Sequence, residues 1–240
     1  MTEDCSHIPN TNFETVDCSP RRPVPKTVRM IDAARPAQIY DIFAIANLHR
    51  RFIADTLSSS REQPGLDVID FYYRTIISRA DSAVYVACDE NLVIGYASVV
   101  RNHGRVLLNM LFANPTVFMK ILIQPHMIQW RFIRYMMAKF FHENLGGKWP
   151  TTMTGLKNAG ELRSVVVEPE YRGLSVGNAL LKASVGFAGQ NDWGTLIAWV
   201  AESNLPSRCL FERAGFSKIA EKMEAHGKVF VYANPCSRTE

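Results

Sequence analysis

The chain has 240 residues, of which 47% are hydrophobic and 21% charged, enough for one substantial core and near the size at which one domain becomes two. Its net charge of +4 arises from 27 basic and 23 acidic residues, which are spread along the sequence rather than gathered into a stripe. This distribution argues against nucleic-acid binding and suits a small anionic ligand.

The most apolar stretch, residues 106–130, is interrupted by two prolines and a lysine. A bilayer-spanning helix needs about 20 predominantly apolar residues, so we expect no membrane span, while peripheral contact with a membrane stays open. The N-terminus carries acidic residues where a signal peptide would be basic and then apolar. The five cysteines form no CxxC pair, which predicts reduced thiols, no metal site and a cytoplasmic protein.

Residues 1–26 are polar and contain four prolines, which predicts a disordered tail. A strand is expected at 27–32, and helices at 37–52 and 67–79, because apolar residues recur there at the matching spacing. Strands at 83–88 and 92–100 flank the turn Asp89-Glu90-Asn91 and predict a hairpin. Gly95, inside the second of these strands, predicts a close approach or a bulge.

Residues 102–158 are interpreted as a helical insertion that packs on the core or walls a substrate pocket. After it, the pattern predicts a strand at 161–167, a helix at 177–190, a buried strand at 195–201 and a helix at 205–214. Two closing strands follow at 218–220 and 229–232.

The segment from Val165 to Leu181 carries the clearest chemical signal. It predicts a strand, a short loop and a helix, and the loop holds Arg172, Gly173, Ser175 and Gly177. A helix N-terminus exposes unpaired N–H groups at the positive end of the dipole, and glycines let the backbone approach a ligand closely. The segment therefore predicts an anion cradle suited to a pyrophosphate, with Arg172 at its rim.

The same loop resembles the R/Q-x-x-G-x-G/A signature of the GNAT acyltransferase superfamily, and V-x-V-x-P-E-Y-R-G before it and x-A-L-L after it strengthen the resemblance. Downstream, Asn204 to Phe216 is similar to that family's N-x-x-[AS]-x-x-[LF]-Y-x-x-x-G-F motif. The resemblance covers residues 27–232 as an architecture and residues 161–216 as specific motifs.

The resemblance implies one α/β (α+β) domain at 27–235 that contains the helical insertion at about 102–158. Its mixed, mostly antiparallel sheet would be flanked by helices, with central strands that splay apart around the pantetheine arm of acetyl-CoA. Val165 and Val167 would pair with pantetheine, and Asn204 and Ser207 would line the arm near the thioester. The residues implied to contact the coenzyme are Val165, Val166, Val167, Arg172, Gly173, Leu174, Ser175, Val176, Gly177, Asn178, Asn204, Ser207 and Phe211.

Amine acylation requires a neutral amine, whereas an alkylammonium has a pKa of about 10, so a base or a water relay to one is useful. Several family members carry a catalytic glutamate at the position of Glu161, which implies that Glu161 is the base. Strand alternation places it on the same face as Val165 and Val167 unless a bulge intervenes. The alternative is that Glu161 merely begins a strand as a solvated charge. The N–H of Val167 would polarise the thioester carbonyl.

Two positions depart from the family pattern. Phe211 stands where many members have a tyrosine that protonates the leaving thiolate, so Cys209, Ser207, Tyr232 or water would have to replace it, or the thiolate leaves unassisted. Ser175 replaces a loop glycine, which weakens the cradle if its φ has to be positive.

We therefore predict an acetyl-CoA-dependent N-acyltransferase that moves an acyl group to a primary amine, with a small molecule such as an amino sugar as the leading acceptor. A protein lysine or N-terminal acetyltransferase is an alternative, and a non-catalytic acyl-CoA-binding regulatory module is another. Either a monomer or a homodimer is compatible with the sequence.

Overall fold

A computed structural model describes residues 34–53, 66–113, 156, 158–224 and 227–236. The expected tail at 1–26, the expected strand at 27–32 and most of the expected insertion at 102–158 lie outside these residues. The domain limits accordingly stay a prediction.

The first half of the described chain follows the expected order of helices and hairpin. It comprises β1 (Arg35–Pro36), the 3-10 helix η1 (Ile39–Asp41), α1 (Ile42–Phe52), α3 (Leu66–Ile77), β2 (Ser82–Asp89), β3 (Leu92–Val100) and α4 (His103–Ala113).

The second half contains the motif segment and the closing strands. It comprises β4 (Ala159–Val167), the 3-10 helix η3 (Pro169–Tyr171), α7 (Val176–Gln190), β5 (Thr195–Ala201), α8 (Leu205–Arg213), β6 (Ser217–Glu224) and β7 (Gly227–Pro235). The two closing strands are longer than predicted because they pair with each other along an antiparallel hairpin.

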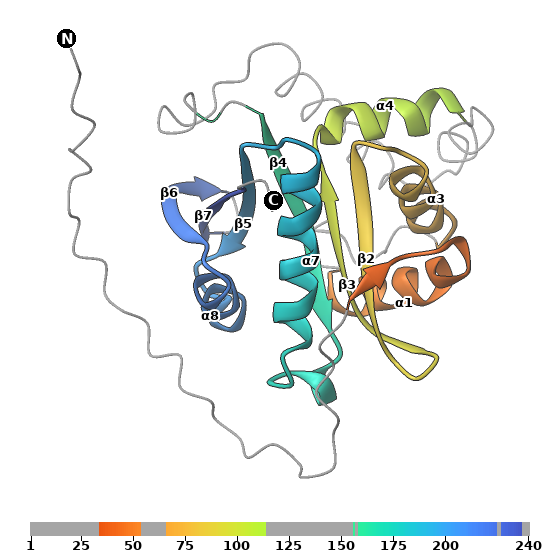
Figure 1. Cartoon of the computed structure of the whole chain (residues 1–240), viewed down its shortest axis with the longest axis horizontal. Helices are drawn as coiled ribbons and strands as arrows, with labels where there is room; N and C mark the ends of the chain where they lie inside the picture. Colours follow the sequence, from red (N-terminus) through yellow and green to blue (C-terminus); the bar gives the residue numbers. More distant parts are fainter. Residues whose placement is uncertain (1–33, 54–65, 114–155, 157, 225–226, 237–240) are drawn as a thin grey trace.

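The described strands form one sheet in the order β1-β2-β3-β4-β5-β7-β6, with α7 in front of it in Figure 1 and α1 and α3 on its other side. Every neighbouring pair is antiparallel except β4 and β5, which are parallel. The prediction of a mixed, mostly antiparallel sheet flanked by helices is therefore confirmed.

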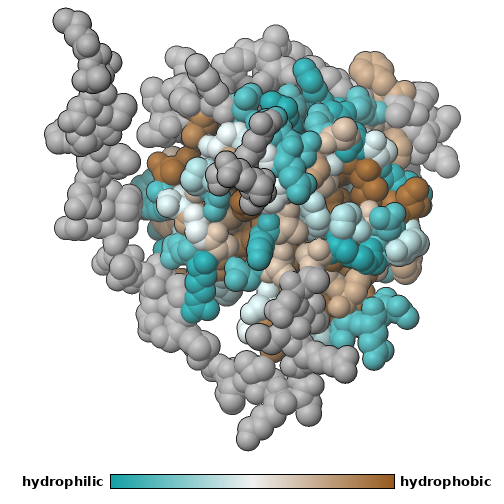
Figure 2. All heavy atoms as spheres, viewed as in Figure 1, coloured by the Kyte–Doolittle hydropathy of each residue, from teal (hydrophilic) through white to brown (hydrophobic). Residues whose placement is uncertain are grey.

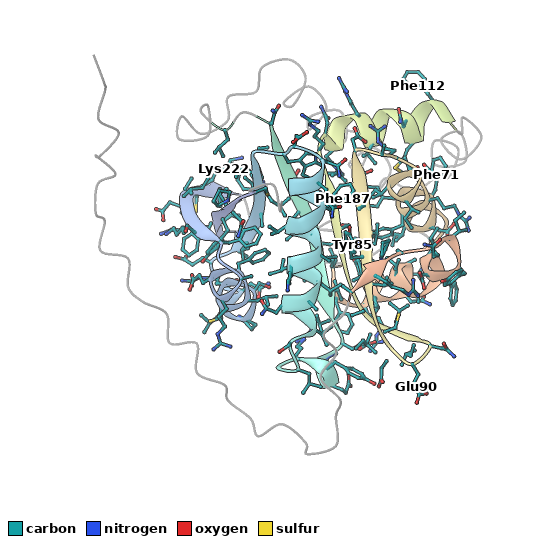
Figure 3. The ribbon with its side chains drawn as sticks, in the orientation of Figure 1. Phe71, Tyr85, Glu90, Phe112, Phe187 and Lys222 are labelled. Atoms are coloured by element: carbon teal, nitrogen blue, oxygen red, sulfur yellow. The ribbon has the colours of Figure 1, made fainter. Side chains whose placement is uncertain are left out.

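The two larger hydrophobic clusters lie on opposite faces of the sheet, and a smaller third one is formed by Ile197, Val231 and Ala233. Leu180 and Leu181 of α7 are buried against one face, where Tyr85 and Phe187 also meet edge to face, as Figure 3 shows. Ile45 of α1 and Tyr73 of α3 are buried against the other. On the outer surface in Figure 2, polar and apolar residues of the described part are interspersed over the visible face.

The sheet opens between β4 and β5. The two strands pair only where Ala159–Leu162 lies beside Thr195–Ala198. Beyond that point β4 follows β3 as far as Val167, while β5 follows β7 as far as Ala201. The central strands therefore splay apart, as predicted, and one edge of β4 has no strand neighbour among the described residues.

A β-bulge in β4 coincides with this opening. Ser98 of β3 lies opposite Ser164, but the next residue, Val99, lies opposite Leu162, so Arg163 is one extra residue in β4. A bulge of this kind interrupts the alternation of side chains between the two faces. Accordingly, Leu162 and Val165 both pack in the cluster under α7, although they are three residues apart.

Two glycines in the sheet permit close contacts. A Cβ on Gly95 would lie 2.7 Å from the carbonyl oxygen of Val166, which confirms the predicted close approach. A Cβ on Gly160 would lie 1.9 Å from Cε3 of Trp193, whose side chain is fully buried. The indole of Trp193 therefore packs directly on the backbone of β4.

We expect Gly160→Ala to destabilise the protein by about 1–3 kcal/mol, because overpacking against a buried ring forces the core to shift. Gly186→Ala is the control: an added Cβ there meets nothing within 4 Å, and alanine should stabilise α7 by roughly 0.5–1 kcal/mol. Urea unfolding of both variants checks this, and equal stability of the two would contradict the packing described for Trp193.

Candidate functional site

The loop between β4 and α7 ends in a set of free backbone donors. The first hydrogen bond of α7 runs from the N–H of Ala179 to the carbonyl of Ser175, at 2.9 Å. No carbonyl of the described residues accepts from the N–H groups that precede it, those of Gly173, Ser175, Val176, Gly177 and Asn178. Because these donors gather at the positive end of a helix, the geometry suits a bound anion.

The backbone of this loop turns through two left-handed residues. Gly173 has φ +86°, which glycine adopts without strain, and Ser175 has φ +62°. A left-handed conformation costs a residue with a Cβ roughly 1–2 kcal/mol. The condition under which Ser175 was expected to weaken the cradle is thus met. The side chains of Leu174 and Val176 are buried, so only their backbone atoms can contact a ligand.

Arg172 lies at the rim of the loop. Its Nε donates to the carbonyl of Val167 at 3.1 Å, and its guanidinium lies 5.7 Å from the ring centroid of Phe52 at the end of α1. Beside it, Arg51 forms a 2.5 Å ion pair with Glu168. The contacts with Val167 and Phe52 hold the guanidinium of Arg172 between the end of β4 and the end of α1.

Along the open edge of β4, the backbone groups of every second residue face the gap between β4 and β5. The N–H of Glu168 donates to Ile94 of β3 at 2.8 Å. In an antiparallel ladder the bonded residues alternate, so the N–H and C=O groups of Val165 and Val167 face the gap beside β4. The N–H groups of both residues and the C=O of Val165 are available to a ligand that adds as a strand, while the C=O of Val167 already accepts from Arg172. Val166 turns its side chain into the cluster under α1 and α3.

The second motif supplies structural contacts. The side-chain oxygen of Asn204 accepts from the N–H of Ser207 at 3.2 Å and so caps α8. Phe211 is only 5% exposed and packs against Phe216, with ring centroids 5.1 Å apart, and against Tyr232. Asn204 and Ser207 stay at the surface, while Phe211 belongs to the core.

Two of the expected substitutes for a thiolate-protonating tyrosine are engaged elsewhere. The hydroxyl of Tyr232 donates to Glu212 at 2.7 Å, and burial followed by this contact raises the pKa of Tyr232. Cys209 is disulfide-bonded, so the expectation of a reduced thiol is wrong at this residue, and it has no proton to give.

Glu161 lies on the other face of the sheet from the one expected. It is paired with Val100, which belongs to the cluster under α1 and α3, whereas Val165 belongs to the cluster under α7. The prediction of a shared face is therefore wrong, because the bulge at Arg163 reverses the alternation. The carboxylate of Glu161 accepts a hydrogen bond from the guanidinium of Arg163.

A buried polar network on this second face was missed by sequence reasoning. Nδ1 of His49 lies 2.8 Å from the hydroxyl of Tyr73 and 2.9 Å from that of Tyr96. Below them the hydroxyls of Ser98 and Ser164 are 2.5 Å apart. A signal was available: His49 follows Ile45 by one helical turn on the apolar side of the predicted helix.

His49 is uncharged at neutral pH. Its side chain is 7% exposed, and burial, then the charge of Arg163, lowers its pKa to about 4. Burial likewise raises the pKa values of Tyr73 and Tyr96. The network therefore consists of neutral groups that stand beside an ion pair.

Among the described residues, no group of three or more histidine, cysteine, aspartate or glutamate side chains is placed to hold a metal ion. No helix in the same residues is long and apolar enough to cross a membrane.

Comparison with known proteins finds one matching family model and a set of similar folds. Residues 131–216 match the model of the acetyltransferase (GNAT) family. No curated protein matches the chain. The chain is also similar to solved structures. Because the sequence identities are below 20%, this similarity establishes the fold alone.

Three of these structures illustrate the TM-scores, sequence identities and coverages found. An N-acetyltransferase from Staphylococcus aureus Mu50 has a TM-score of 0.55 at 16% identity, covering 85% of this chain and 98% of that one. A GNAT phosphinothricin acetyltransferase from Sinorhizobium meliloti in complex with AcCoA has 0.57 at 19%, covering 87% and 90%. A ribosomal-protein-alanine N-acetyltransferase from Brucella melitensis has 0.51 at 18%, covering 84% and 98%. The predicted resemblance to the GNAT superfamily is confirmed.

The low pKa of His49 predicts an acid-sensitive fold. Unfolded histidine titrates near 6.5, so between pH 6.5 and about 4 only the unfolded chain gains this proton. The stability linked to His49 is complete above pH 6.5 and is lost as the pH falls towards 4, by up to about 3 kcal/mol. Urea unfolding at several pH values should show this slope, and His49→Gln should flatten it; an unchanged slope in His49→Gln would count against the buried neutral imidazole.

Proposed function

We propose that this chain, which has the GNAT fold and matches that family's model through its central segment, is an acetyl-CoA-dependent N-acyltransferase. The observation that carries the proposal is the combination of an open edge on β4 with free N–H groups at the start of α7. Support also comes from the phosphinothricin acetyltransferase of similar fold, which is described with AcCoA bound.

The donor would lie across both features. The pyrophosphate would accept from the free N–H groups between Gly173 and Asn178, where the helix dipole favours negative charge. The pantetheine arm would pair with the backbone of Val165 and Val167 in the gap beside β4. The N–H of Val167 would then stabilise the oxyanion that develops on the thioester carbonyl.

The acceptor would approach β4 near the bulge. Its neutral nitrogen attacks the thioester carbon, the C–S bond breaks, the nitrogen loses a proton and coenzyme A leaves as a thiolate. We propose Glu161 as the base that receives the proton, since it stands on β4 just before the bulge. Phe211 is buried and has no proton to give, so the thiolate leaves unassisted or takes a proton from water.

The acceptor we propose is a small amine, for which an amino sugar is one example. The similarity in fold to a ribosomal-protein-alanine N-acetyltransferase keeps a protein N-terminus as the second candidate. Release of free thiol from acetyl-CoA with amino sugars, other small amines and short peptides separates the two. Tight binding of acetyl-CoA without release on any acceptor would instead identify a non-catalytic binding module.

One backbone N–H of the proposed pyrophosphate site can be deleted with little other change to the structure. Asn178 is exposed in the first turn of α7, where proline is tolerated, so Asn178→Pro deletes its free N–H group. We expect about a tenfold or greater loss of coenzyme A affinity in calorimetry, because the lost hydrogen bond is to a charged group.

The matched control keeps that donor. Asn178→Ala removes the side chain and retains the N–H, so its affinity should stay within about threefold of the wild type. Pantetheine, which has no pyrophosphate, should bind both variants alike. Equal coenzyme A affinities of the proline and alanine variants would contradict the cradle.

Removal of the carboxylate tests the base. Glu161→Gln should lower kcat about 10²- to 10⁴-fold at neutral pH and flatten the acidic limb of the pH profile, while acetyl-CoA affinity stays the same. Glu221→Gln, at an exposed carboxylate on β6, is the control. An unchanged pH–rate profile in Glu161→Gln would show that another group takes the proton.

A further inference from the structure

A chain of hydrogen bonds joins β3 and β4, at the bulge, to α3. The hydroxyl of Tyr73 donates to the oxygen of Tyr96 at 2.9 Å. Because that proton is engaged, the hydroxyl of Ser164, at 3.5 Å, is the donor to the oxygen of Tyr73. The hydroxyl of Ser98 lies 2.5 Å from that of Ser164 and donates to it. The four hydroxyls are therefore linked in one direction, from the strands towards the tyrosines.

The imidazole of His49 on α1 ends the chain. The hydroxyl proton of Tyr96 is left for Nδ1 of His49, at 2.9 Å. A neutral imidazole accepts at one of its ring nitrogens. Since burial lowers the pKa of His49 to about 4, the ring is neutral at neutral pH and can take this part. Each of the four hydroxyls accordingly has an acceptor for its proton.

The two serines are the members of the chain that lie on the bulged pair of strands. Ser98 is 0% exposed and Ser164 is 8% exposed, and the two lie opposite each other across β3 and β4. A buried hydroxyl without a partner is costly. A shift of β4 by one residue would move the side chain of Ser164 away from Ser98. The hydrogen bond between the serines therefore favours the register in which they stay opposite.

This pairing decides which residue of β4 is the extra one. Val99 of β3 lies opposite Leu162. With Ser164 held opposite Ser98, the residue left over is Arg163. If Arg163 lay opposite Ser98 instead, Ser164 would be the bulged residue and its hydroxyl would leave the hydrogen-bonded chain.

The bulged residue is in turn a partner of the proposed base. The guanidinium of Arg163 donates to the carboxylate of Glu161, and both side chains are only partly exposed. A base has to lie within hydrogen-bond reach of the proton that it removes. The place of Arg163 in the strand therefore bears on the direction in which the carboxylate of Glu161 points.

We infer that Ser98, Ser164 and Tyr73 are positioning residues of the acyl transfer: their hydrogen bonds select Arg163 as the bulged residue and, through its contact with Glu161, orient the proposed base. The inference rests on the proposed function. Coenzyme A binding does not depend on this selection, because Val165 keeps its place opposite Ala97 whichever of the two preceding residues is the extra one.

The register can be read by NMR without turnover. In the wild type, cross-strand backbone NOEs should link Ser98 with Ser164 and Ala97 with Val165. In Ser164→Ala the first contact should weaken and one between Ser98 and Arg163 should appear, because the hydrogen bond that distinguishes the two registers is gone. The contact between Ala97 and Val165 should stay.

Turnover tests the effect on the proposed base. With acetyl-CoA and the acceptor that gives the fastest thiol release, Ser164→Ala should lower kcat roughly 10- to 100-fold, since a misplacement of about 1 Å has this effect. Tyr73→Phe, which removes the next hydroxyl of the chain, should act alike. Acetyl-CoA affinity should stay within about twofold in both. In the Glu161→Gln background neither change should lower kcat further, because the group through which they act is absent.

A double variant separates positioning from stability. Ser164→Ala leaves the hydroxyl of Ser98 buried without its partner, whereas Ser98→Ala with Ser164→Ala removes both groups and should regain most of the urea midpoint. Its kcat should nevertheless stay low. Ser184→Ala is the control: it removes an equally buried hydroxyl that donates to Leu180 within α7, and it should change neither kcat nor the NOEs of β4.

Three outcomes would overturn the inference: an unchanged register in Ser164→Ala, recovery of kcat together with stability in the double variant, or an equal loss of kcat when Glu161 is already glutamine. Each leaves the proposed function standing as long as the wild type releases thiol. If the wild type releases thiol with no acceptor, the proposed function fails, while the altered register of Ser164→Ala would still support the selection of the bulged residue.

Discussion

The bulge at Arg163 is the constraint on which the rest of the site depends. The bulge adds one residue to β4, so the side chains that follow it point to the opposite face from the one that alternation predicts. It lies at the point where β4 separates from β5. An edge of β4 is thereby left unpaired inside a sheet rather than at its border. A ligand with strand-like hydrogen bonding can add there without exposing the sheet to aggregation.

The same bulge gives the two sides of β4 different chemistry. Under α7 the strand presents Val165 and open backbone groups that lead to the free donors at the start of the helix. Under α1 and α3 it presents Glu161 and Arg163 beside the neutral network of His49. One side carries open backbone donors, and the other holds charges of both signs beside buried neutral groups.

The secondary structure of the motif segment was predicted well because it is determined by local sequence. The strand, loop and helix around Gly173 follow from neighbouring residues, and so does the position of the free N–H groups. The face of Glu161 was predicted wrongly, since a bulge depends on the register with β3 and alternation within one strand does not reveal it. The burial of Phe211 was missed for a similar reason, since its stacking on Tyr232 joins residues that are distant in the chain.

The amino-acid sequence by itself determined the family resemblance, the order of the described elements and the free N–H groups at the start of α7, because each follows from the spacing of residues close together in the chain. Only the tertiary structure decided which face of β4 carries Glu161, and that His49, Tyr73 and Tyr96 meet. Those facts depend on the pairing of β3 with β4 and on the packing of α1 against α3, where residues far apart in the chain exclude water together.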